Sequence, residues 1–130
     1  MPVKTALVNA AYVGAGGFIG AVVRYFLSGL VQRTAGAMGF PYGTLVVNMV
    51  GCLAIGVVVG MIDTRQVLHP EFRVFLLVGV LGGFTTYSTF GLETFALLKD
   101  TEYLRAVTNV MVHVILGLAL VWLGYAMASR

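Results

Sequence analysis

The stretch GGFTTYSTFGLE, residues Gly82–Glu93, lies inside the third of four long apolar runs in this chain. Two glycines open it, a carboxylate closes it, and four serine or threonine side chains lie between them. Paired glycines weaken a helix, and threonine and serine hydroxyls bond nearby backbone instead of extending it. Irregular backbone at membrane depth persists only where it is buried in protein or lines a wet cavity. The stretch therefore predicts either a helix broken beside an interface or pore, or an unbroken helix whose threonines bond the preceding turn.

The composition indicates an integral membrane protein. Of its 130 residues 59% are hydrophobic and 10% are charged, with a mean hydropathy of +0.96. A soluble domain carries about 25% charged residues. The single cysteine, Cys52, excludes an intramolecular disulfide and a cysteine-based metal cluster. The net charge of +3 is not gathered into a basic stripe, so no nucleic-acid partner is expected.

Charged residues separate four apolar runs, and each is long enough to cross a bilayer core, which takes about 20 residues. We expect an all-α fold with one transmembrane domain over residues 1–130. Its four helices are expected over about residues 5–31, 43–62, 72–98 and 104–128, and the third is expected to break near Gly82–Thr86.

Topology signals are nearly absent. Four spans place both termini and the middle loop on one side of the membrane, and orientation follows the Lys/Arg bias between sides. One side carries four cations and the other three, so the chain is expected to insert both ways, or else with a weak preference set by other determinants. The cations are Lys4, Arg65, Arg73 and Arg130 on the first side and Arg33, Lys99 and Arg105 on the second.

Insertion in both orientations favours an antiparallel two-fold homodimer in the lipid bilayer. Four helices also leave little room to enclose an aqueous path, which again favours an oligomer. Small residues four apart permit close helix approach, and three glycine pairs offer such contact faces. They are Gly16 and Gly20, Gly56 and Gly60, and Gly79 and Gly83.

Polar residues inside spans are candidates for function. Thr44 and Asn48 share one face of the second span because they are four apart. Asn48 would either bond across helices or donate to an anion. In the fourth span Asn109, His113 and Gly117 share a face; a lone histidine there is more often a packing or hydrogen-bonding group than a ligand, and we expect no metal on it.

After the expected break, Tyr87 and Phe90 lie on one side of a resumed helix, and Glu93 lies four residues beyond Thr89. Aromatic edges favour an anion and aromatic faces a cation, so the rings alone leave the sign of the ion open. Arg24 would either reach the interface or concentrate anions at a pore mouth. Glu93 has to pair, accept hydrogen bonds or be protonated.

Four segments together resemble the Fluc (CrcB) family of fluoride channels. They are GGFIGAVVRYFL (Gly16–Leu27), GTLVVNMVG (Gly43–Gly51), GGFTTYSTFGLETFALL (Gly82–Leu98) and VHVILGLAL (Val112–Leu120), in order across nearly the whole chain. The resemblance implies a dual-topology homodimer with two pores, which passes fluoride passively out across the plasma (inner) membrane and relieves fluoride toxicity. It implies a multi-pass membrane protein that is not an enzyme.

The resemblance also implies site residues. A structural Na⁺ would lie at the dimer interface on backbone carbonyls, at positions matching Gly82 and Thr85. Together with the polar faces above, it gives an expected fluoride pore and vestibule. The pore residues are Asn48, Tyr87, Ser88, Thr89, Phe90, Glu93, Thr44 and His113, and Arg24 matches the vestibule arginine. Two departures stand out: the first pore aromatic is usually phenylalanine, not Tyr87, and Gly117 and Val121 replace a frequent serine and threonine.

Other classes fit less well. A small dual-topology, proton-coupled multidrug exporter would use a membrane carboxylate, for which Glu93 is the candidate; by resemblance, such exporters carry it in the first helix, where this chain has none. A non-transporting assembly subunit would explain the glycines but not the asparagine and the hydroxyls. A membrane enzyme is disfavoured because no nucleophile–base pair or metal set is visible.

Overall fold

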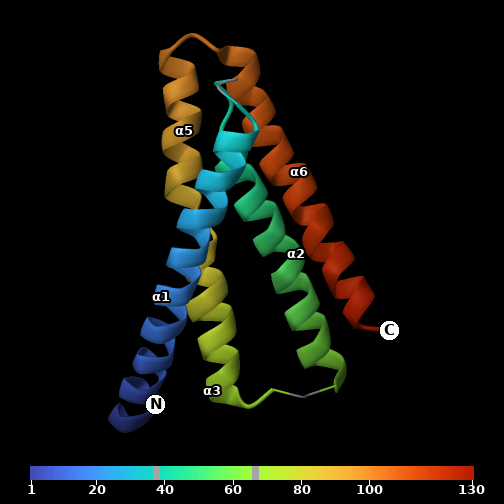
Figure 1. Ribbon diagram of the computed structural model, residues 1–130. Helices are drawn as coiled ribbons and strands as arrows, with labels where there is room; N and C mark the ends of the chain where they lie inside the picture. Colours follow the sequence, from blue (N-terminus) through green and yellow to red (C-terminus); the bar gives the residue numbers. More distant parts are fainter. Residues whose placement is uncertain (37–38, 66–67) are drawn as a thin grey trace.

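The computed structural model describes residues 1–36, 39–65 and 68–130, and these residues are helical apart from short connections (Figure 1). Two long helices come first, α1 (Val3–Thr34) and α2 (Tyr42–Arg65). The third stretch, Pro70–Lys99, which we call the third path, consists of four consecutive helical elements. They are α3 (Pro70–Arg73), the π-helix η1 (Val74–Leu81), α4 (Gly82–Phe84) and α5 (Tyr87–Lys99). The fourth stretch is one long helix, α6 (Tyr103–Ala128).

Four helical stretches are long and apolar enough to span a membrane, which confirms the all-α membrane class and the number of spans predicted. An 18-residue window in each has a mean hydropathy of 1.7, 2.5, 1.5 and 2.1 in chain order, with residues Pro70–Lys99 counted as one stretch. Only 11–28% of the apolar window of each stretch is buried in the single chain, and many large apolar side chains are exposed. That surface needs lipid or another protein chain to cover it.

Glycines permit a close helix approach between α1 and the third path. A Cβ placed on Gly16 would lie 2.5 Å from the carbonyl oxygen of Phe75, and one on Gly20 would overlap the carbonyl oxygen of Val80. On the opposite helix, a Cβ on Gly83 would lie 2.7 Å from the carbonyl oxygen of Gly17. Because backbone meets backbone at these points, no larger residue fits without moving a helix.

A second glycine contact joins α2 to α6, which pack along most of their length (Figure 1). Cβ atoms on Gly56 and Gly124 would overlap the carbonyl oxygens of Val121 and Leu53, respectively. The glycine pairs were expected to offer faces for oligomerisation. In the structure all three pairs make close contacts inside one chain.

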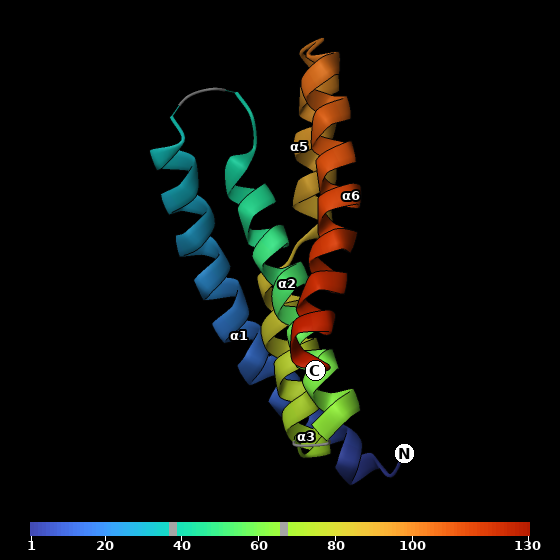
Figure 2. The ribbon, with the colours of Figure 1, turned by 90° about the vertical axis from the view of Figure 1, so that its right-hand side faces the viewer.

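The third path changes direction at two extended residues. Thr85 has φ −84° and ψ 157°, and Thr86 has φ −150° and ψ 121°, between the last residue of α4 and the first of α5. The hydroxyl of Thr85 donates to the carbonyl of Leu81 (2.9 Å), and Thr86 caps α5 by accepting from the N–H of Thr89 (3.3 Å). Beyond this point α5 runs beside α6, while the upper end of α1 inclines away from both (Figure 2).

Candidate functional site

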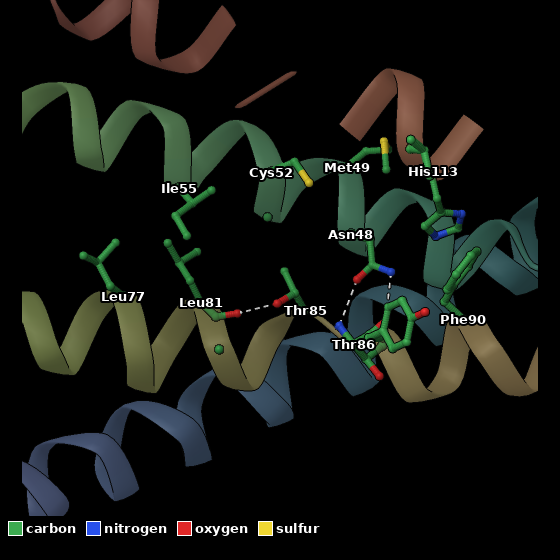
Figure 3. Close-up of a pocket in the computed structure, with 14 residues that line it drawn as sticks. Asn48, Met49, Cys52, Ile55, Leu77, Leu81, Thr85, Thr86, Phe90 and His113 are labelled. Atoms are coloured by element: carbon green, nitrogen blue, oxygen red, sulfur yellow. Dashed lines mark hydrogen bonds between the residues drawn. The ribbon is translucent and has the colours of Figure 1, made fainter. Parts of the chain in front are cut away.

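Asn48 of α2 holds the extended segment of the third path. Its Nδ2 donates to the carbonyl oxygen of Thr86 (3.0 Å), and its Oδ1 accepts from the N–H of Thr86 (2.9 Å). Figure 3 shows the two bonds side by side. An extended residue between two helices leaves its backbone groups without helical partners, and unpaired buried backbone groups are costly. Asn48 satisfies both groups, and the second of its two amide N–H groups makes no hydrogen bond among the residues that the structure describes.

A cavity of about 420 Å³ opens beside this pair of bonds. It brings together six residues that the sequence placed in the site: Asn48, Gly82, Thr85, Tyr87, Phe90 and His113. The remaining lining is largely apolar and includes Met49, Cys52, Ile55, Leu77 and Leu81 (Figure 3). Among the described residues that line it, none carries an aspartate, glutamate, lysine or arginine side chain. Polar groups from α2, α5 and α6 therefore meet in an apolar surrounding.

Three rings follow one another along this cavity. The Tyr87 and Phe90 rings are tilted by 51° with centroids 5.6 Å apart, and the His113 ring lies 4.3 Å from that of Phe90. Tyr87 is 83% exposed in the single chain, although one side of its ring packs against Phe90. Phe90, in contrast, is held between Tyr87 and the imidazole.

Arg24, Thr44, Thr89 and Glu93 lie around two other cavities. Arg24, Thr44 and Thr89 line one of about 220 Å³ between α1, α2 and α5, and Thr86 lines it too. Thr44 also lines one of about 430 Å³ together with Glu93. Thr86 lines both the 220 Å³ cavity and the 420 Å³ cavity, so it connects the two groups of residues.

Glu93 accepts a hydrogen bond, which is one of the three states the sequence allowed for it. Thr44 Oγ1 donates to Glu93 Oε1 over 2.6 Å. Glu93 Oε2 is buried and has no hydrogen-bond partner among the residues that the structure describes. Ser88 is exposed and lines none of these three cavities, so its place in the site stays a prediction.

A buried network on α6 supports the rings. Asn109 is fully buried, and its Nδ2 donates to Thr94 Oγ1 (3.0 Å), whose hydroxyl donates to the carbonyl oxygen of Phe90 (2.8 Å). The backbone carbonyl of Asn109 lies 2.9 Å from His113 Nδ1. Asn109 thus connects the backbone of one ring-bearing residue to the side chain of the other.

The structural roles of two residues, Thr86 and Gln32, were not identified from the sequence. Thr86 was counted only as a hydroxyl, although a threonine before a resumed helix is a standard N-cap signal. Gln32 closes the first connection: its Nε2 donates to the carbonyl of Phe40 (3.1 Å), and its Oε1 accepts from the N–H of Gly43 (3.1 Å). No periodicity identifies Gln32, because its partners lie eight and eleven residues away across a loop.

Comparison with known proteins assigns the chain to a family. The family model described as "CrcB-like protein, Camphor Resistance (CrcB)" matches residues 11–125. The chain belongs to the CrcB family. This confirms the resemblance read from the four segments.

Several CrcB relatives carry the name "Fluoride-specific ion channel FluC". One from Nitratidesulfovibrio vulgaris is 46% identical over 112 residues, which cover 86% of this chain and 90% of the relative. One from Methylobacillus flagellatus is 42% identical over 117 residues, covering 90% and 91%. A "FluC 1" from Methanosarcina acetivorans is 43% identical over 112 residues, covering 86% and 84%. These names describe ion channels, not enzymes, and they lend no support to the exporter alternative.

Proposed function

We propose that this chain forms a fluoride-selective channel through which fluoride leaves the cell passively across the plasma membrane, relieving fluoride toxicity. The observation that carries the proposal is the identity of 42–46% to relatives named fluoride-specific ion channels, over most of both chains. The geometry is consistent with it, because Asn48 of α2, Tyr87 of α5 and His113 of α6 line one cavity.

The proposed pore wall supplies donors without formal charge. A selectivity filter replaces the hydration shell of its ion at close quarters, and fluoride is small and strongly hydrated. The second amide N–H of Asn48, the hydroxyls of Ser88 and Thr89, and the ring edges of Tyr87 and Phe90 supply such donors. Uncharged donors stabilise the anion without trapping it. Arg24, Thr44 and Glu93 belong to the approach to this pore in the proposal, since they line the neighbouring cavities.

We propose that two copies assemble as an antiparallel homodimer in the membrane. In support, the lining of the 420 Å³ cavity is largely apolar, and Tyr87 and Val78 of the third path are 83% and 58% exposed. The nearly even distribution of cations between the two sides permits both orientations.

A structural Na⁺ at the two-fold axis is part of the same proposal. The residues fit this cation: with ψ at 157°, the carbonyl of Thr85 turns away from the helix axis, and Gly82 and Thr85 border the same cavity. Carbonyl oxygens of interrupted helices are suitable ligands for sodium. One chain offers only part of a ligand set, and the symmetry-related residues of the second copy would complete it.

Orientation is tested by labelling a cysteine variant, and the sodium site by comparing melting temperatures. Arg130→Cys in a Cys52→Ser background is labelled in intact cells with a membrane-impermeant thiol reagent; we expect about half of the sites to be accessible from outside, as dual insertion requires. Purified dimers should melt at a higher temperature in sodium than in potassium, because a ligand that binds the folded state stabilises it. Labelling from one side only would contradict dual topology, and equal melting temperatures would contradict the sodium site.

Fluoride release from liposomes tests the function. Vesicles that contain the purified dimer and are clamped with valinomycin and potassium should lose fluoride rapidly and retain chloride. Protein-free vesicles give the background. An imposed proton gradient should not drive fluoride against its own gradient, whereas a proton-coupled exporter would respond to it. Folded dimers that release no fluoride would refute the channel proposal.

A further inference from the structure

The two nitrogens of the His113 ring have different surroundings. Nδ1 lies 2.9 Å from the backbone carbonyl oxygen of Asn109. A carbonyl only accepts hydrogen bonds, so Nδ1 carries a hydrogen whether the ring is neutral or cationic. The state of Nε2 follows: it presents a lone pair when the ring is neutral and an N–H when the ring is protonated. Binding a proton therefore changes Nε2 from an acceptor to a donor.

The second ring nitrogen, Nε2, contributes no hydrogen bond to the described part of the fold. It is buried and has no hydrogen-bond partner among the residues that the structure describes. The ring borders the 420 Å³ cavity, where it contacts Phe90, and Asn48 lines the same cavity from α2. A lone pair at this position repels an anion, while an N–H attracts one.

Among the described residues that line the cavity, no carboxylate is present to pair with a protonated His113. The titratable groups on the same cavity are Cys52 from α2 and Tyr87 from α5. Glu93, one turn beyond Phe90 on α5, is hydrogen-bonded to Thr44 and lines a different cavity. Arg24 of α1 lines the 220 Å³ cavity. A charge in an apolar site needs a partner of opposite sign, so an anion that enters the cavity is the available partner for a protonated His113.

We propose that His113 is a conditional fluoride ligand: once protonated, it donates Nε2–H to fluoride in the cavity, and fluoride occupancy and conduction increase. The inference rests on the proposed fluoride channel. In it, fluoride remains an anion and the proton remains on the ring, so no proton crosses with the ion. Asn48 and the hydroxyls still bind fluoride when the ring is neutral, so the channel conducts in both states.

Histidines ordinarily change charge between about pH 5 and about pH 8, which sets the experiment. Fluoride release at sub-saturating fluoride is measured with both faces of the vesicle at about pH 5.5 or about pH 7.5. We expect the wild type to be several-fold faster at the lower pH. His113→Gln should show no such increase, because an amide does not titrate in this range. The matched control is His69→Gln, since His69, which precedes α3, is the only other histidine of the chain; it should respond as the wild type does.

Protein-free vesicles at each pH correct for the leak of undissociated hydrogen fluoride. Equal wild-type flux at both pH values, or a His113→Gln variant that keeps the response, would overturn the role of His113 while leaving the channel intact. No fluoride flux at either pH would instead refute the channel itself, and this inference with it.

A second measurement does not depend on the folding of a His113 variant. Nitrogen NMR of labelled histidine in the His69→Gln protein follows the one remaining imidazole. We expect fluoride, and not chloride, to move its titration to higher pH, by about one unit for each tenfold preference of fluoride for the protonated ring. A titration that fluoride leaves in place would overturn the inference.

Discussion

Asn48→Asp is expected to abolish fluoride conduction, with a loss of at least about 100-fold in release rate. The substitution keeps the size of the side chain but removes both N–H donors. The carboxylate would face the carbonyl oxygen of Thr86, which now accepts from Asn48 Nδ2 (3.0 Å), so an attraction becomes a repulsion. A negative charge would also stand where the fluoride anion is proposed to pass.

The liposome assay measures this effect, and Asn9→Asp is the matched control. Asn9 lies in α1, far along the chain from the site, and its Nδ2 bonds only the sulfur of Met1 among the described residues. That variant adds the same charge and should conduct as the wild type does. The size and yield of the purified Asn48→Asp dimer establish that it has assembled. Conduction within about twofold of the wild type would refute the role of Asn48.

Gly20→Ala is expected to destabilise the folded chain strongly. Its Cβ would overlap the carbonyl oxygen of Val80 and lie 2.8 Å from the backbone nitrogen of Phe84. Backbone atoms move only if α1 separates from the third path. Overpacking of this kind costs about 3 kcal/mol.

Unfolding in a detergent titration measures the change, with Gly14→Ala as the control on the same helix. A Cβ on Gly14 meets no atom within 4 Å, so this alanine should be neutral or stabilising by up to about 1 kcal/mol through its helix propensity. If both variants unfolded at the same point, the close approach of α1 to η1 and α4 would not be what limits stability.

Much of the architecture follows from local properties of the chain. Each of the four spans is visible because charges interrupt the apolar runs, and a run that cannot be solvated has to enter lipid. The family is readable from four short segments in order, and the match over residues 11–125 confirms it. The polar residues were predictable as candidates because a polar group in a span is costly unless it has a task.

Pairings between distant residues were not predictable. Asn48 and Thr86 are 38 residues apart and Thr44 and Glu93 are 49 apart, yet each pair is hydrogen-bonded. Sequence spacing reports the face of one helix, and it contains nothing about the rotation of one helix against another. For Asn48, the sequence left open an interhelical bond or an anion donor. The structure shows the interhelical bond, while the donor role stays a prediction.

The membrane class, the spans and the family are therefore properties of the amino-acid sequence, because hydropathy and short motifs act locally. Packing decided that the glycine pairs join helices within one chain, which no single helix face reveals. Packing also decided that the Asn109 carbonyl holds Nδ1 of His113 and leaves Nε2 unpartnered among the described residues of the site. The physical reason is that the hydrogen-bonding state of a buried group depends on which other groups the folded chain brings within about 3 Å of it.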